Sequence, residues 1–284
     1  MLTLMAITMF LLVTQIASTY GWATQNINTE LKSRTSAFKA HRHHVTQLKD
    51  TPLEEPDNRF GRMTYWDESY RNSLVENDDT NDRHSSKNET ETFSWYCGWE
   101  NELEPFFAEL VPVEQNPSVL VPGIGNDACI RDMFDAGYHC LTAFDYAPEG
   151  VECAKRMFGS ERLQLVQDLR VADARSLPYG DASYDAALDK GTLDSIYLSG
   201  GKDKELARKH LGMAIDELAR VVKEGGIVFS VTAACVDAVQ QAFDECNERN
   251  RRWKQIRDGS VYMTEDGYTS NNVDATMLVW ERIK

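Results

Sequence analysis

The sequence predicts an α/β fold: a Rossmann-like sheet, parallel except for an antiparallel last strand, with helices on both faces. Three observations lead to this fold class. Residues 119–145 read as a buried strand, a glycine loop, a helix and a second strand. Strand and helix patterns then alternate as far as residue 250. The chain closes with two strand patterns, at 253–263 and 275–281, and the hairpin that joins them reverses the direction of the last strand.

The first strand and the loop that follows it predict a ligand site of the nucleotide type. The apolar run at 119–121 leads into Gly123, Gly125 and Asn126, and the second strand ends in Asp145. Glycine lets the backbone approach a ligand at positions where a side chain would clash. A carboxylate at the end of the second strand can accept both hydroxyls of a ribose. The stretch therefore predicts a nucleoside-cofactor site at the carboxyl ends of two parallel strands.

The later strands narrow the choice of nucleoside. The third strand, 163–171, leads to Asp173 and Ala174, which suit the exocyclic amine of an adenine. The fourth, 184–188, ends in D-K-G-T-L-D (189–194), which NAD binding does not require. The glycine loop also matches G-x-G-x-x-A with an acid 20 residues beyond its second glycine, a dinucleotide-binding pattern. The acidic strand ends and the terminal hairpin favour S-adenosylmethionine over NAD.

The remaining elements follow from the spacing of apolar residues. Helices are expected where apolar residues recur every three or four positions, and a further strand where an apolar run follows two glycines. These are helices at 146–158, 206–222 and 236–250 and a strand at 227–232. An amphipathic stretch at 93–110 precedes the first strand.

The first 58 residues are expected to lie outside this domain, as a leader and a disordered extension. Residues 2–16 form an apolar run like the core of a secretory signal, and residues 24–49 are basic and acid-poor, like a transit peptide. The leader suggests secretory or plastid targeting, and a cytoplasmic protein with a disordered extension is the alternative. At about 15 residues the run is short for a membrane span of roughly 20, so no stable span is expected after leader removal.

The folded domain is expected at 59–284, with an acidic insert at about 74–92. The whole chain has a net charge of −15, and residues 1–50 carry a surplus of basic side chains, so the domain is more acidic still. Such a surface repels nucleic-acid phosphates and attracts basic partners, so no nucleic-acid substrate is expected. The six cysteines have no metal-ligand spacing and read as buried thiols, so no metal site is expected.

Seven motifs occur in the order typical of one family. They are Y-W-D-E-S-Y (65–70), F-S-W-Y (93–96), V-P-G-I-G-N (121–126), F-D-Y (144–146), D-A-R-S-L-P-Y (173–179), S-Y-D-A-A-L-D-K-G-T-L-D (183–194) and E-L-A-R-V-V-K-E-G-G (217–226). Through these motifs, about residues 60–232 resemble class I, seven-strand S-adenosylmethionine-dependent methyltransferases. Within that class they resemble the methyltransferase-like group that methylates lysines of translation elongation factor 1-alpha. The resemblance implies a seven-strand methyltransferase sheet, S-adenosylmethionine as the cofactor and a basic protein as the methyl acceptor.

The resemblance also implies which residues bind the cofactor. An aromatic lid, the glycine loop and the strand ends supply them: Trp66, Tyr70, Trp95, Gly123, Gly125, Asn126, Asp145, Tyr146, Asp173, Ala174, Asp189 and Lys190. Several have a plainer alternative. The three lid aromatics are equally suited to a hydrophobic core, Lys190 to a surface ion pair and Asp189 to a loop cap.

The predicted function is transfer of a methyl group to a lysine amine of a protein. The acceptor lysine must be neutral, and burial under the aromatic lid would lower its pKa from about 10.4. Two alternatives stay open: methylation of a small molecule, and a non-catalytic methyltransferase fold that binds only the cofactor or a partner. The sequence predicts neither a catalytic base nor an oligomeric state.

Overall fold

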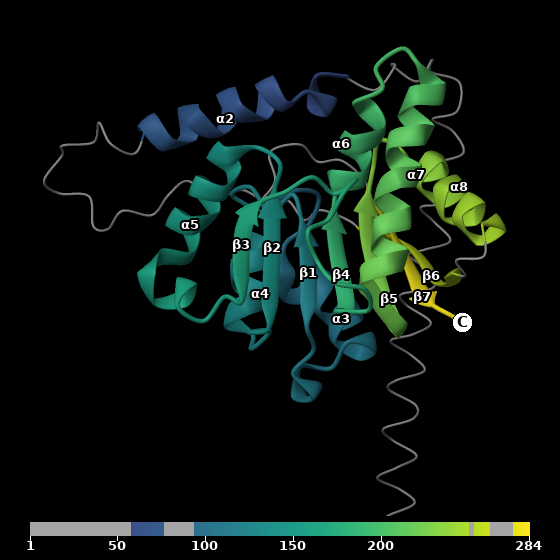
Figure 1. The fold of residues 1–284 in the computed structure, drawn as a ribbon. Helices are drawn as coiled ribbons and strands as arrows, with labels where there is room; N and C mark the ends of the chain where they lie inside the picture. Colours follow the sequence, from purple (N-terminus) through teal and green to yellow (C-terminus); the bar gives the residue numbers. More distant parts are fainter. Residues whose placement is uncertain (1–57, 77–93, 250–252, 262–274) are drawn as a thin grey trace, which may run out of the picture. The chain divides into compact units, whose positions relative to one another are not determined.

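A computed structural model describes residues 58–76, 94–249, 253–261 and 275–284 (Figure 1). All of these ranges belong to one compact unit, Pro56–Lys284. The predicted leader and most of the predicted acidic insert lie outside the described residues, as does the turn-rich segment at 262–274. The expectations for those segments therefore stay predictions.

The strands of the described residues form one seven-stranded sheet. In chain order they are β1 (Val119–Pro122), β2 (Leu141–Asp145), β3 (Asp168–Val171), β4 (Tyr184–Lys190), β5 (Val222–Thr232), β6 (Trp253–Val261) and β7 (Ala275–Arg282). Across the sheet the order is β3-β2-β1-β4-β5-β7-β6. β7 runs antiparallel to both β5 and β6, and the other neighbouring pairs are parallel. The predicted fold class, with its antiparallel last strand, is confirmed.

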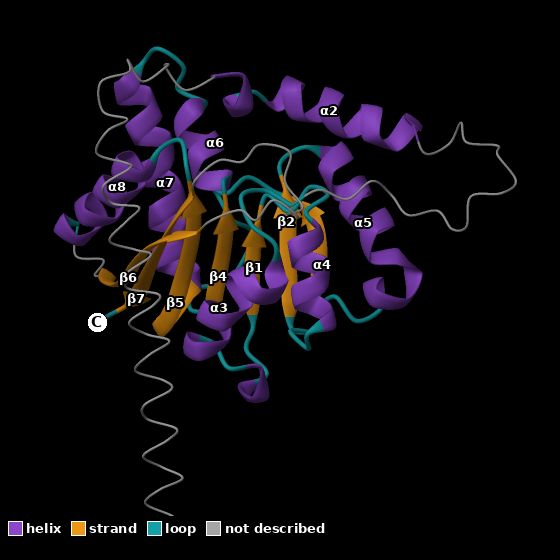
Figure 2. Cartoon of the chain, turned by 180° about the vertical axis from the view of Figure 1, so that it is seen from behind, coloured by secondary structure: helices purple, strands orange, loops and turns teal. Residues whose placement is uncertain are grey.

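Helices cover both faces of the sheet (Figures 1 and 2). One face carries η3 (Trp99–Leu103), α3 (Glu104–Leu110), α4 (Ala128–Asp135) and α5 (Pro148–Leu163), and the other carries α6 (Thr192–Leu198), α7 (Lys204–Val221) and α8 (Val236–Glu248). Asp127 begins α4, because its side chain accepts a hydrogen bond from the Cys129 amide at 3.0 Å. Asp203 begins α7 in the same way. No helix in the described part of the chain is long and apolar enough to span a membrane.

Two element boundaries differ from the sequence prediction. Helix α5 continues to Leu163, so β3 begins only at Asp168. Strand β5 begins at Val222, within residues that read as the end of a helix and a turn. The pairing of β4 with β5 shifts register between Tyr184 and Ala186, and Gly225 has a φ of +77°. The two glycines therefore form an irregular start of the strand rather than a turn before it.

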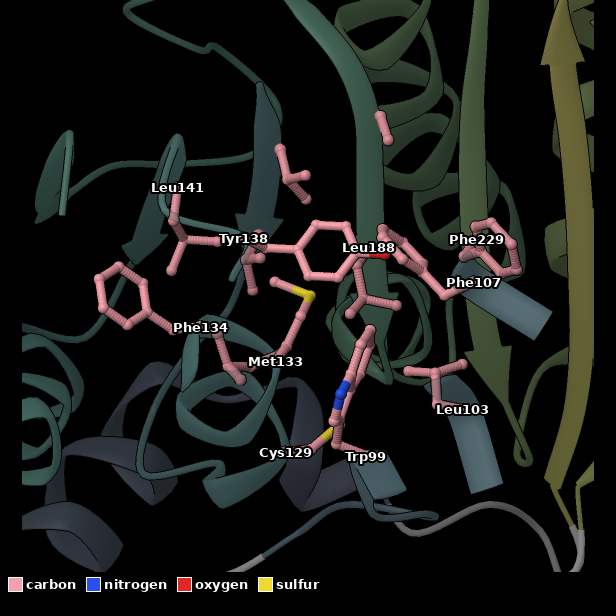
Figure 3. Packing of buried hydrophobic residues seen from close by; sticks show 14 of the residues in the cluster. Trp99, Leu103, Phe107, Cys129, Met133, Phe134, Tyr138, Leu141, Leu188 and Phe229 are labelled. Atoms are coloured by element: carbon pink, nitrogen blue, oxygen red, sulfur yellow. The ribbon is translucent and has the colours of Figure 1, made fainter. Parts of the chain in front are cut away.

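The core on the α3–α5 face is an aromatic and aliphatic cluster (Figure 3). Phe107 of α3 packs on Phe229 of β5 with 4.8 Å between ring centroids. Trp99 meets Tyr138 edge to face at 5.5 Å, and the Tyr138 hydroxyl donates to the carbonyl oxygen of Val111 at 2.8 Å. The opposite face has its own core, which includes Phe243 stacked on Trp280. Both faces of the central strands are thus buried, which holds the strand ends rigidly in place.

The segment before the sheet lies across the carboxyl ends of the parallel strands. It consists of η2 (Asn58–Gly61) and α2 (Met63–Glu76), and both views place α2 above the arrowheads of β1, β2 and β3 (Figures 1 and 2). Gly61 packs so closely on α6 that a Cβ there would lie 2.3 Å from the Leu198 carbonyl carbon. Arg71 of α2 pairs with Glu149 of α5 at 2.7 Å. The segment is therefore attached to helices on both sides of the sheet.

Candidate functional site

A cavity of about 250 Å³ opens at the carboxyl ends of β1, β2 and β4. Gly123, Asp145 and Lys190 line it from the strand ends. Six aromatic side chains form much of the rest of its wall: Phe60, Trp66, Tyr70, Trp95, Tyr96 and Tyr146. All of these aromatics except Tyr146 come from segments that precede the sheet. Segments far apart in the sequence therefore build one aromatic-walled cavity, which is called the aromatic cavity below.

A second cavity, of about 530 Å³, lies beside the first. Gly123, Tyr146, Thr192 and Ser195 line both cavities, so the two are adjacent. The second is lined mainly by apolar residues around the ends of β2 and β3, including Phe144, Val171, Ala172 and Ala174, together with Asp173 and Arg175. Its mainly apolar lining with a few polar groups suits the binding of an aromatic base.

The two glycines of the loop after β1 have no room for a side chain. Gly123 has a φ of +63°, and a Cβ there would lie 2.1 Å from Thr192 Oγ1. Gly125 has a φ of +46°, and a Cβ there would lie 2.3 Å from the hydroxyl oxygen of Tyr70. Thr192 is itself held by a 2.9 Å hydrogen bond to the Pro122 carbonyl. Gly123 lines both cavities, whereas Gly125 lies beneath Tyr70 and lines neither.

Asp145 lies at the end of β2 and faces the aromatic cavity. Its Oδ2 accepts from the Gly125 amide at 3.0 Å, and its Oδ1 accepts from the Ala147 amide at 2.9 Å. Burial raises the pKa of Asp145 to about 6, although these backbone donors oppose the rise. A carboxylate fixed in this way keeps lone pairs for further donors, such as ribose hydroxyls.

The lid aromatics of the sequence prediction are brought together over this carboxylate. Trp66 stacks on Tyr70 at 5.7 Å and meets Trp95 edge to face at 5.4 Å. The Trp66 indole N–H donates to the Phe60 carbonyl at 2.7 Å. Trp66 and Tyr70 are buried, and all three aromatics line the cavity. The three aromatics thus belong both to a local hydrophobic core and to the cavity wall. The lid and the core, which were alternatives in the sequence analysis, do not exclude each other.

Asp173 and Ala174 line the second cavity, as an adenine-edge role requires. Asp173 is already paired: Arg175 donates to both of its carboxylate oxygens, with the shortest contact at 2.7 Å. Partial burial would raise the pKa of Asp173, but the Arg175 hydrogen bonds hold it below its usual range. The carboxylate is therefore ionised and fixed in orientation at the edge of this cavity.

Lys190 reaches the wall of the aromatic cavity, but its ammonium is occupied. Nζ donates to Asp127 Oδ2 at 2.9 Å and to the Cys97 carbonyl at 2.7 Å. The side chains of Lys190 and Asp127 are only 3% and 5% exposed. Burial alone would lower the pKa of Lys190, but the Asp127 charge raises it above its ordinary value. Lys190 therefore links β4 to the start of α4 and to the segment that carries Trp95.

Three predicted site residues, Gly125, Asn126 and Asp189, line neither cavity. Asp189 is fully buried and accepts from the amides of Thr192 and Leu193 at the start of α6, and from the Ser230 hydroxyl at 2.6 Å. Burial raises its pKa to about 7. Asp189 thus has the arrangement of a loop cap, the plainer of its two sequence interpretations.

Sequence reasoning did not name Tyr96 and Asp194 as site residues, yet both line the aromatic cavity. Their side chains meet there, with the Tyr96 hydroxyl donating to Asp194 Oδ2 at 2.8 Å. Both residues end a quoted motif, F-S-W-Y and D-K-G-T-L-D, and their place in these motifs was the available signal. Thr192, which is in contact with the glycine loop, was missed in the same way.

The residues of the two cavities suit a nucleoside cofactor with an amino-acid tail. Gly123 presents backbone without a side chain to both cavities, Asp145 can accept ribose hydroxyls, and the second cavity offers apolar walls with an acidic edge for adenine. In the described part of the chain, no group of three or more histidine, cysteine or acidic residues is placed to hold a metal ion.

Comparison with known proteins agrees with this geometry. Residues 120–230 match a family model described as a methyltransferase domain. EEF1A lysine methyltransferase 4 of Mus musculus is 27% identical over 195 residues, which are 66% of this chain and 68% of that protein. The eEF1A lysine and N-terminal methyltransferase homolog of Drosophila pseudoobscura pseudoobscura is 24% identical over 180 residues, which are 63% of this chain. This chain spans only 23% of the length of that second relative.

Among solved structures, N-methyltransferase NodS of Bradyrhizobium japonicum WM9, in complex with S-adenosyl-L-homocysteine, aligns with a TM-score of 0.48. The sequence identity is 12%, and the alignment covers 80% of this chain and 100% of that one. The domain match, the curated relatives and the strand order identify a class I methyltransferase domain that resembles the eEF1A lysine methyltransferases. The domain is S-adenosylmethionine-dependent, so the predicted class and cofactor are confirmed.

Proposed function

We propose that this protein transfers a methyl group from S-adenosylmethionine to the amine of a lysine side chain in a basic protein. The observation that carries the proposal is the aromatic cavity, in which aromatic side chains and groups suited to the cofactor, Gly123 and Asp145, line one space. The names of the curated relatives, which are eEF1A lysine methyltransferases, support the same acceptor class. The net charge of −15 favours docking of a basic protein surface.

The chain's contribution to the reaction is alignment and exclusion of water. When bound, S-adenosylmethionine supplies a methyl group that its sulfonium charge has already activated toward displacement. Asp145 and the glycine loop would hold the ribose and the methionine end, and Asp173 with Ala174 would hold the adenine edge. Trp66, Tyr70 and Asp145 are all buried, which keeps bulk water away from this side of the cavity.

The cavity wall also prepares the acceptor lysine. A free lysine amine has a pKa of about 10.4, so at neutral pH it is almost entirely protonated and not nucleophilic. Transfer from water to a cavity walled by Phe60, Trp66 and Trp95 disfavours the charged form and lowers that pKa. The neutral amine fraction at the methyl group therefore rises on binding.

The test is methyl transfer from S-adenosylmethionine with a labelled methyl group. Recombinant protein would be incubated separately with purified elongation factor 1-alpha and with a protein-free extract of small metabolites. We expect label in lysine of the protein acceptor, and none with the Asp145→Ala variant. Label only in the small-molecule fraction would replace the lysine acceptor by a small molecule. No label in either fraction, with intact binding of S-adenosylhomocysteine, would favour the non-catalytic alternative.

A further inference from the structure

Tyr96 is held in an unusual backbone conformation at the wall of the aromatic cavity. Its φ is +63°, and of the described non-glycine residues with positive φ, Tyr96 alone lines this cavity. Such a conformation persists where surrounding contacts hold it, and it is more frequent at functional sites than elsewhere. The ring lies against Gly191, where a Cβ would be 2.9 Å from it. The positive φ of Tyr96 and the missing side chain of Gly191 together make room for the tyrosine ring.

The Tyr96 hydroxyl has its proton directed away from any ligand. It donates to Asp194 Oδ2 at 2.8 Å, and Asp194 is only 3% exposed. The Asp194 carboxylate also accepts from the Thr232 hydroxyl and from the Ala233 amide at 3.1 Å. These donors fix the carboxylate, and the carboxylate fixes the tyrosine hydroxyl. The hydroxyl oxygen can therefore act toward the cavity only as a hydrogen-bond acceptor.

The surroundings of this acceptor suit a neutral amine. Phe60, Trp66 and Trp95 line the same cavity, and such an apolar wall favours the neutral amine over the ammonium. The lysine in the wall, Lys190, is neutralised by Asp127. Tyr96 and Asp194 line the aromatic cavity but not the second one, which the adenine would occupy. The aromatic cavity thus combines an acceptor oxygen with aromatic walls, and Tyr96 and Asp194 lie outside the cavity assigned to the adenine.

We propose that the Tyr96 hydroxyl oxygen binds an N–H of the acceptor amine and directs the nitrogen lone pair toward the methyl group, with Asp194 as its positioning residue. The inference rests on the proposed function and adds the residue that orients the nucleophile. In the transfer, an N–C bond forms as the C–S bond breaks. The electron pair of the broken bond stays on sulfur, and the nitrogen becomes a methylammonium that releases its proton to water.

The test uses n-butylamine as a probe for the lysine side chain and full-length protein loaded with S-adenosylhomocysteine. Calorimetry should detect butylamine binding to the wild type, and Tyr96→Phe should weaken it about tenfold. The affinity for S-adenosylhomocysteine itself should change by less than about twofold. Tyr138→Phe is the matched control, because the Tyr138 hydroxyl also makes a 2.8 Å hydrogen bond, to Val111, and lines neither cavity. Asp194→Asn keeps the tyrosine but removes its charged acceptor and should weaken butylamine binding by a smaller factor.

Three results would overturn the proposal. The first is that the wild type does not bind butylamine, or that Tyr96→Phe binds it as tightly as the wild type does. If Tyr96→Phe does not fold, unchanged butylamine binding in Asp194→Asn would overturn the proposal instead. The second is a parallel loss of S-adenosylhomocysteine affinity, which would place Tyr96 in the cofactor site. The third is a Tyr96→Phe variant that no longer binds S-adenosylmethionine more tightly than S-adenosylhomocysteine. That result would mean that Tyr96 contacts the sulfonium of the cofactor and not the acceptor amine. Butylamine binding needs no protein acceptor, so a failed transfer to elongation factor 1-alpha would refute only the proposed function.

Discussion

Replacing Lys190 by methionine separates a structural role of this residue from a role in cofactor binding. The change removes the ammonium and keeps a side chain of similar length. In the structure that ammonium contacts Asp127 and the Cys97 carbonyl, and the Lys190 and Asp127 side chains are 3% and 5% exposed. The variant therefore leaves a buried carboxylate without its counter-charge. Breaking a buried ion pair from one side costs about 3–5 kcal/mol of unfolding free energy.

A double-mutant cycle measures this effect directly. Asp127→Asn alone leaves a buried ammonium and should cost a similar amount, whereas Lys190→Met combined with Asp127→Asn removes both charges. We expect the double variant to be more stable than the sum of the single effects predicts, by about 2 kcal/mol or more. Urea unfolding gives the free energies, and calorimetry gives the affinity for S-adenosylhomocysteine. A Lys190→Met variant that loses under about 1 kcal/mol of stability but more than tenfold in affinity would refute the structural role.

Two further predictions concern the cofactor side of the cavity. Trp66→Ala removes an indole that both packs on Tyr70 and lines the cavity. It should lower the free energy of unfolding by about 3 kcal/mol and the affinity for S-adenosylhomocysteine about tenfold. An unchanged affinity in calorimetry would show that Trp66 is not a cofactor-binding residue. The pKa of Asp145 is about 6, and its ionised form is the better acceptor for ribose hydroxyls, so affinity should rise as pH increases from 5 to 7 and then level off. Asp145→Asn should bind more weakly with a flatter profile, and a wild-type affinity independent of pH would contradict this role.

The strand-end residues could be predicted from the sequence because their signals are local. Gly123 and Asp145 each follow an apolar run directly, and a parallel sheet brings the carboxyl ends of its strands to one edge. The order of elements and the terminal hairpin then predict the strand direction without any knowledge of packing. The main errors lie at the boundaries of β3 and β5, where helical and strand patterns overlap in the sequence.

The contacts between side chains could not be predicted, because they join distant parts of the chain. Tyr96 and Asp194 are 98 residues apart, and Asp127 and Lys190 are 63 apart. Nothing in the local pattern around Lys190 distinguishes an ammonium that faces a ligand from one held by a buried carboxylate. Asp189 and Asp194 pose the same problem, since both are buried acids of one motif and only Asp194 lines the cavity.

The aromatic cavity is encoded in two separate stretches of sequence. The groups suited to the cofactor follow β1, β2 and β3, whereas Phe60, Trp66, Trp95 and Tyr96 all precede the sheet. Mutations in the early stretch can therefore change the wall of the cavity while the groups at the strand ends stay in place. Exchange of residues 58–76 and 94–96 between related enzymes would replace that part of the wall and leave the strand-end groups unchanged.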